Sequence, residues 1–130
     1  MDKEKYTIEY NLSTVSTNLL WSYVSTPVGL STWFADDVTA DGRSFTFYWA
    51  KEGHKAEQIG TRAGSCIRFH WCDDTNPKSY FELRIIYNEL VNDVILEVTD
   101  FAGEADMKDS KNLWNEQITA LRKRLGAKNK

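Results

Sequence analysis

The segment of residues 21–36, WSYVSTPVGLSTWFAD, constrains the fold of this chain more than any other part of the sequence. It predicts the end of an amphipathic helix, a turn at residues 25–27 and a short second helix that ends near Trp33. Pro27 ends the first helix, because a residue before proline is disfavoured in the α region. The bulky side chains of Trp21 and Trp33 bracket the two helices and require one fixed packing arrangement between them.

An antiparallel sheet is predicted over residues 38–101, where apolar and polar residues alternate with the period of a half-buried strand. Turn signals at Asp41-Gly42 and Glu52-Gly53 are expected to join neighbouring strands. The glycines in the middle of this region are expected at strand ends or bulges. The expected strands are a short one at Val38, then residues 44–49, 54–63, 65–72, 80–87 and 94–101.

A further strand and a long helix flank this region. The strand is predicted over residues 6–12, and Ser13 or Thr14 is expected to supply the N-cap of the helix that follows. After the sheet, residues 106–125 carry apolar side chains at three- and four-residue steps, which is typical of a helix that lies across an apolar surface. The order of elements predicts an α+β fold, in which a curved antiparallel sheet of about seven strands is closed on its concave face by the last helix.

Residues 21–36 also resemble a known signature, the first helices of the START-like, or SRPBCC, superfamily. The most similar branch is named for activator-of-heat-shock-ATPase homologues. The matching positions are Trp21, Pro27, Leu30, Trp33, Phe34 and Asp36. The resemblance extends more weakly over the whole chain and implies a helix-grip fold, with two short helices after the first strand. The middle departs from the family pattern at residues 58–62, QIGTR, and the subfamily therefore stays open.

Composition limits the classes of function. The 130 residues include 16 basic and 19 acidic side chains, a net charge of −3, so the basic field that nucleic-acid binding requires is missing. The length fits one domain, residues 1–130. The charged start, MDKEK, differs from a signal peptide, and no apolar run reaches transmembrane length. We therefore expect a cytoplasmic protein that does not insert into membranes.

The sequence carries no readable catalytic or metal-binding motif. Neither His54 nor His70 has a nucleophile and an orienting group in a recognisable pattern, which favours surface or structural roles. Cys66 and Cys72 lie six residues apart on one expected strand, about 20 Å, which is too far for a disulfide. They also lack the clustered partners of a zinc site. We expect no cofactor, no metal and no catalytic residue.

Inward-facing aromatic and aliphatic residues carry the remaining functional signal. They either fill the space between the sheet and the last helix as core, or line a cavity there. The resemblance favours a cavity, because START-like domains commonly hold hydrophobic ligands in this position, and such pockets are mostly apolar. The candidate ligand-binding residues are Tyr10, Trp33, Phe45, Phe47, Trp49, Phe69, Trp71, Phe81, Leu83, Tyr87, Trp114 and Ile118.

Three functions follow from these observations. The first is a non-catalytic module that binds a small hydrophobic or amphipathic ligand between the sheet and the C-terminal helix. The second is a protein-interaction module, either a homodimer or a regulator of a chaperone-type ATPase, with Tyr48 and Ile95 as outward-facing candidates. The third is a cavity enzyme such as a cyclase. An enzyme needs an ionisable residue inside the pocket, whereas the expected inward positions are almost all apolar.

Overall fold

The computed structural model describes residues 3–126, in which seven strands form one curved antiparallel sheet. The strand order is β1-β7-β6-β5-β4-β3-β2, so that β1 and β2 are the two edges. The strands are β1 Glu4–Asn11, β2 Asp37–Asp41, β3 Ser44–Trp49, β4 Glu52–Arg62, β5 Cys66–Trp71, β6 Phe81–Asn88 and β7 Asp93–Ala102. The helices are α1 Thr17–Ser25, α2 Pro27–Leu30 and α3 Met107–Leu125, with a 3-10 turn at Glu104–Asp106 before α3. This is the α+β, helix-grip architecture expected from the sequence.

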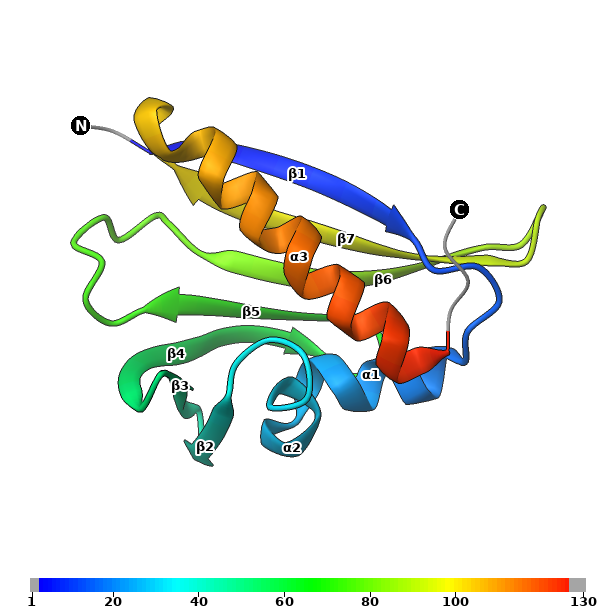
Figure 1. Ribbon diagram of the computed structural model, residues 1–130, viewed down its shortest axis with the longest axis horizontal. Coiled ribbons are helices and arrows are strands. Elements are labelled where there is room, and N and C mark those ends of the chain that lie inside the picture. The colour runs from blue at the N-terminus through cyan, green and yellow to red at the C-terminus, as the bar shows by residue number, and fades with distance from the viewer. Residues whose placement is uncertain (1–2, 127–130) are drawn as a thin grey trace.

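Helix α3 lies diagonally across one face of the sheet, and its C-terminal end comes close to α1 (Figure 1). Three residues of the expected apolar stripe on α3, Trp114, Ile118 and Leu121, are buried against this face, whereas Leu113, also expected in the stripe, is 56% exposed. The β6–β7 hairpin extends past the helices at one end of the sheet (Figure 1). The core therefore lies under α3, and the hairpin tip lies outside it.

The N-cap side chains of Ser16 and Thr26 set the first residues of the two short helices. Ser16, rather than Ser13 or Thr14, caps α1, and its Oγ accepts a hydrogen bond of 3.1 Å from the amide of Leu19. Ser13 instead has a φ of 61° in the turn that leaves β1, so the helix begins later than expected. Thr26 caps α2, with a bond of 3.0 Å from the amide of Gly29 to its Oγ1.

The β3–β4 hairpin differs from the turn expected at Glu52-Gly53. Trp49 pairs directly with Glu52, so the two-residue loop consists of Ala50 and Lys51. These residues have φ values of 50° and 69°, the left-handed conformation that tight hairpins require and that Gly or Asn usually supplies. Gly53 therefore lies within β4, two residues from the turn.

Candidate functional site

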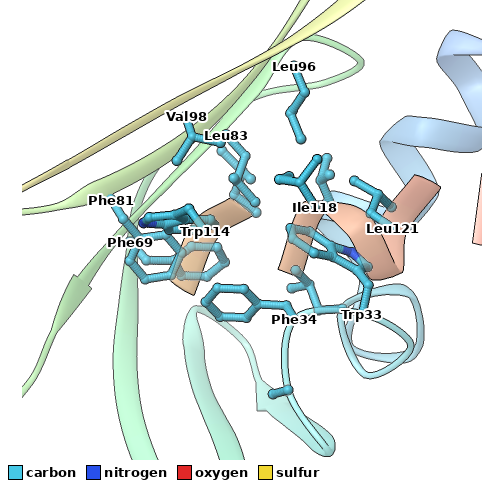
Figure 2. Packing of buried hydrophobic residues seen from close by; sticks show 14 of the residues in the cluster. Trp33, Phe34, Phe69, Phe81, Leu83, Leu96, Val98, Trp114, Ile118 and Leu121 are labelled. Atoms are coloured by element: carbon cyan, nitrogen blue, oxygen red, sulfur yellow. The ribbon is translucent and has the colours of Figure 1, made fainter. Parts of the chain in front are cut away.

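Phe34, in the loop that follows α2, lies at the centre of an aromatic cluster between the sheet and α3. Its ring centroid lies 5.2 Å from that of Phe47 and 5.4 Å from that of Phe81 on the sheet. On the helix side, the centroid of Trp114 is 5.5 Å away. Figure 2 shows Phe34 below Phe81 and Trp114, with Trp33 directed toward the other end of the core.

The backbone of Phe34 is held in place by hydrogen bonds to its carbonyl group. Its carbonyl oxygen accepts a bond of 3.1 Å from Nε1 of Trp49 on β3 and one of 2.8 Å from Nε2 of Gln117 on α3. Nε1 of the neighbouring Trp33 donates to the carbonyl of Tyr23 on α1 at 2.9 Å. The loop is thus tied to the sheet and to two helices at once.

Five of the twelve expected ligand-binding residues fill the interior of the core and line neither the cavity nor the groove described below. Phe45 and Phe69 lie 4.9 Å apart between ring centroids, and Phe69 and Phe81 stack at 5.1 Å. Side chains in this part of the core are at most 4% exposed. The five residues are Phe45, Phe47, Phe69, Leu83 and Ile118. Phe81 is equally buried, but it also lines a cavity.

A cavity of about 140 Å³ lies between the sheet and the N-terminal half of α3. Four expected residues line it together, namely Trp49, Trp71, Phe81 and Trp114. Its other lining residues, Phe34, Asp100, Ser110, Leu113 and Gln117, were not predicted as ligand-binding residues. The cavity therefore has aromatic walls and a few polar groups, which is the usual composition of a small-molecule site.

The inner cavity borders a wider groove of about 440 Å³ between α3 and the loop after α2. Phe34, Trp49, Leu113 and Gln117 line both spaces. Leu113 is 56% exposed, so its side chain lies at the boundary between the groove and solvent. The expected residue Trp33 lines the groove and not the inner cavity.

Asp100 on β7 places a carboxyl group among the lining residues of the cavity. Its Oδ2 accepts a bond of 2.8 Å from Nε1 of Trp114 and a longer one of 3.5 Å from the hydroxyl of Tyr6. The same hydroxyl is hydrogen-bonded to Oγ of Ser110 on α3. Burial raises the pKa of Asp100, against the opposing effect of the Trp114 and Phe101 N–H donors. Burial also raises the pKa of Tyr6 to about 12, so its hydroxyl stays protonated.

Two expected site residues lie away from the cavity. Tyr10 is buried, but its hydroxyl donates to Oδ1 of Asn115 at 2.6 Å and serves to attach β1 to α3. Tyr87 was expected in the interior, but it is 50% exposed and its hydroxyl donates to Oδ1 of Asn92 at 2.7 Å. Alternation gave its side of the sheet correctly, since the directly paired Val94 on β7 is 1% exposed, but Tyr87 lies one residue from the end of β6 and its side chain reaches solvent.

Asp100 is the main residue that the sequence interpretation missed. Val94, Leu96 and Val98 are buried on the inner face of β7, and the same alternation continues to Asp100. Within residues 3–126, no group of three or more His, Cys, Asp or Glu could hold a metal ion. No helix in this range is both long and apolar enough to cross a membrane.

The histidines have surface or local partners. Nδ1 of His70 lies 2.8 Å from the carbonyl of Ser79, and Nε2 of His54 lies 4.0 Å from a carboxylate oxygen of Glu52. Neither histidine lines the cavity. The His54 ring nevertheless packs beside two residues that do, with centroid distances of 5.7 Å to Trp49 and 6.5 Å to Trp71.

Comparison with known proteins identifies the family. The model of the START-like superfamily domain matches residues 1–127. The solution structure of BfR322 from Bacteroides fragilis is 46% identical in sequence and has a TM-score of 0.70. The alignment covers 100% of this chain and 96% of BfR322. None of the curated proteins matches the sequence.

Two further structures share the fold at 14% identity. The Aha1 dimer from Colwellia psychrerythraea has a TM-score of 0.77, with 94% of this chain and 96% of that chain covered. DynU16, from the dynemicin biosynthetic locus, has a TM-score of 0.78, with 96% of this chain and 48% of that chain covered. The family match, which spans nearly the whole sequence, agrees with the helix-grip architecture, and the chain therefore belongs to the START-like superfamily.

Proposed function

We propose that this chain is a non-catalytic START-like module that binds a small amphipathic molecule between the sheet and α3. The observation that carries the proposal is the aromatic cavity of about 140 Å³, which shares four lining residues with the 440 Å³ groove beside it. Ligand pockets usually measure about 300–1,000 Å³, so the inner cavity alone is small and the groove supplies the remaining volume.

The chemistry of the lining favours a neutral ligand. Trp71, Phe81 and Trp114 offer apolar surface inside, whereas Asp100 and Ser110 offer polar atoms. Because burial raises the pKa of Asp100, its carboxyl keeps a proton to higher pH than usual and, in that form, can donate to a hydroxyl or carbonyl group.

The groove adds a second constraint on ligand charge. Asp36 and Glu116 line it, and no basic side chain is among its lining residues in the part of the chain described. An anionic ligand would meet two carboxylates without a compensating cation. The body of the ligand is therefore expected to be uncharged where it crosses the groove.

Binding can be tested with Nile red, a neutral hydrophobic dye, and two matched substitutions. Leu113→Glu places a charge on a partly exposed residue that lines both the cavity and the groove, whereas Leu90→Glu makes the same change at the β6–β7 tip, where Leu90 is 95% exposed. Both exposed sites should tolerate glutamate with little loss of stability. We expect Leu113→Glu to weaken dye binding at least tenfold and Leu90→Glu to leave it unchanged. Equal affinities in the three proteins would contradict the proposal.

The natural ligand can be sought in parallel. Native mass spectrometry of the freshly purified protein should show an additional bound mass, and a panel of neutral amphipathic metabolites should raise the melting temperature. A protein that carries no extra mass, shows no thermal shift with any compound and does not bind Nile red would exclude this function.

Self-association is a second candidate, supported by the exposed apolar tip of the β6–β7 hairpin. Leu90, Val91 and Tyr87 are 95%, 58% and 50% exposed there. The previously expected Tyr48 and Ile95 are partly buried, so the tip replaces them as the contact surface. Sedimentation velocity should show a concentration-dependent dimer that Leu90→Glu abolishes, and a strict monomer would exclude it.

A cavity enzyme is the weakest of the three functions. Asp100 provides an ionisable group, but it is the one carboxyl among the described residues that line the inner cavity. Its neighbour Tyr6, with a pKa of about 12, is a poor base at neutral pH.

A cytoplasmic location stays a prediction from the sequence, which cell fractionation would check.

A further inference from the structure

The face of the sheet opposite α3 carries a second hollow, of about 310 Å³, over strands β4, β5 and β6. Arg68 lines it and alternates along β5 with Ile67 and Phe69, which are buried on the inner face. This hollow is therefore separated from the cavity under α3 by the whole thickness of the sheet. We propose that it binds a small oxyanion, the phosphate group of a soluble metabolite or of a lipid headgroup.

The hollow arises from an irregularity in β4. The register between β4 and β5 shifts between Gln58 and Gly60, so that Gly60 comes to lie opposite Arg68. Because Gly60 has no side chain, the space beside the Arg68 stem stays open; a Cβ at Gly60 would lie 3.9 Å from Cβ of Arg68. The sequence at this point, QIGTR, is also where the chain departs from the family pattern.

Two further arginines flank the hollow in the neighbouring row of the sheet. Arg62 on β4 and Arg84 on β6 both pair with Cys66, one from each side. Directly opposed residues in an antiparallel sheet have Cβ atoms about 4.5–5.5 Å apart, so the small Cys66 side chain lies between two long cationic ones. Arg62, Cys66 and Arg84 all line the hollow.

A buried carboxylate fixes two of the guanidinium groups. Oε1 of Glu82 accepts bonds of 2.9 Å and 2.8 Å from Nε and Nη2 of Arg68, and its Oε2 lies 3.4 Å from Nη2 of Arg84. The Glu82 side chain is only 8% exposed. The Arg68 guanidinium also lies 3.9 Å from the centroid of the Tyr80 ring. Both arginines are therefore held in place before any ligand arrives.

The charges that line the hollow do not cancel. One carboxylate, Glu82, and three guanidinium groups line the hollow; Glu82 pairs with Arg68 and Arg84, and within residues 3–126 Arg62 has no ion pair. Glu97 lies 4.0 Å from Nε of Arg84 but does not line the hollow. A guanidinium has five N–H donors, so those not directed at Glu82 can take two oxygens of a phosphate. A positive site of this kind stands out on a chain whose net charge is −3.

The test uses the full-length protein labelled with ¹⁵N and titrated with inorganic phosphate at constant ionic strength. We expect saturable shifts confined to amides around the hollow, at Gly60, Thr61 and Cys66. Arg62→Gln removes the unpaired cation while leaving both Glu82 contacts, and it should weaken phosphate binding roughly tenfold, the loss of one charge-assisted hydrogen bond. Arg124→Gln, an exposed residue on α3, makes the same change in net charge and should have no effect.

Flotation with vesicles separates the two sources of the phosphate group. Vesicles of phosphatidylcholine alone serve as the reference, and vesicles that also contain phosphatidic acid present a phosphomonoester on a membrane. Arg62-dependent binding to phosphate in solution, to the acidic vesicles or to both supports the site and identifies the source. Shifts that never saturate, or equal binding by the Arg62→Gln and Arg124→Gln proteins in both assays, would overturn it.

Discussion

Replacing Trp114 with alanine best separates a packed core from a ligand cavity. The indole is 4% exposed, lies 5.5 Å from the Phe34 ring and 6.0 Å from the Phe81 ring, and donates to Asp100 at 2.8 Å. Truncating a buried Trp in a filled core costs about 3–5 kcal/mol. Because Trp114 already borders a cavity of about 140 Å³, we expect the lower end, about 3 kcal/mol.

The measurements are urea unfolding and Nile red binding on the same variant. A loss of about 3 kcal/mol corresponds to a melting temperature roughly 10 °C lower for a domain of this size. Dye affinity should change at the same time, because the truncation enlarges the space beside Phe81 and Leu113. Trp114→Phe is the matched control. It keeps a ring but removes the donor to Asp100, and should cost about 1–2 kcal/mol.

The two readouts together decide the interpretation. A loss of 5 kcal/mol or more without any change in dye binding would indicate a filled core and contradict a binding cavity. An alanine variant with unchanged stability and unchanged dye affinity would show that Trp114 does not pack against the sheet at all.

Two further predictions concern Asp100 and Gly29. Burial raises the pKa of Asp100 above its ordinary 3.8, so the folded state holds this proton more tightly than the unfolded state does. The wild type should therefore lose stability relative to Asp100→Asn as pH rises from about 4 through the raised pKa. Parallel curves of unfolding free energy against pH for the two proteins, measured by urea unfolding, would contradict this. Gly29→Ala should cost at least about 3 kcal/mol, because a Cβ there would lie 2.6 Å from Cα of Tyr23 and closer still to the carbonyl of Ser22. Thermal unfolding checks it against Gly60→Ala, which meets no atom nearer than 3.9 Å, and equal melting temperatures for the two variants would refute the steric argument.

The fold could be predicted because its signals are local and repeated. Alternation along each strand gave the inner face correctly for Phe47, Phe69 and Leu83, and all three are fully buried. The strand ends were less accessible to prediction. The β3–β4 turn uses Ala50 and Lys51 at positive φ, residue types that carry no turn signal, so the turn was expected two residues too late, at Glu52-Gly53.

The candidate site could be predicted only in part, because alternation gives a direction and not a depth. Tyr87 shares its side of β6 with Phe81, but it lies one residue from the end of the strand, and its side chain is half exposed although the paired Val94 is buried. Phe34, in a loop without periodicity, lies at the centre of the aromatic cluster, and its contacts depend on how three elements meet. Neither outcome is encoded in the spacing of apolar residues.

Asp100 shows how a departure from the pattern can carry more information than the pattern itself. A carboxyl at an inward position of β7 costs free energy unless it is paired, and here Trp114, Tyr6 and the amide of Phe101 provide the hydrogen bonds. An apolar residue would fill the same position without that requirement. Under the function proposed above, this carboxyl would recognise a polar group on the bound molecule, and its place among the lining residues of the cavity would allow that contact.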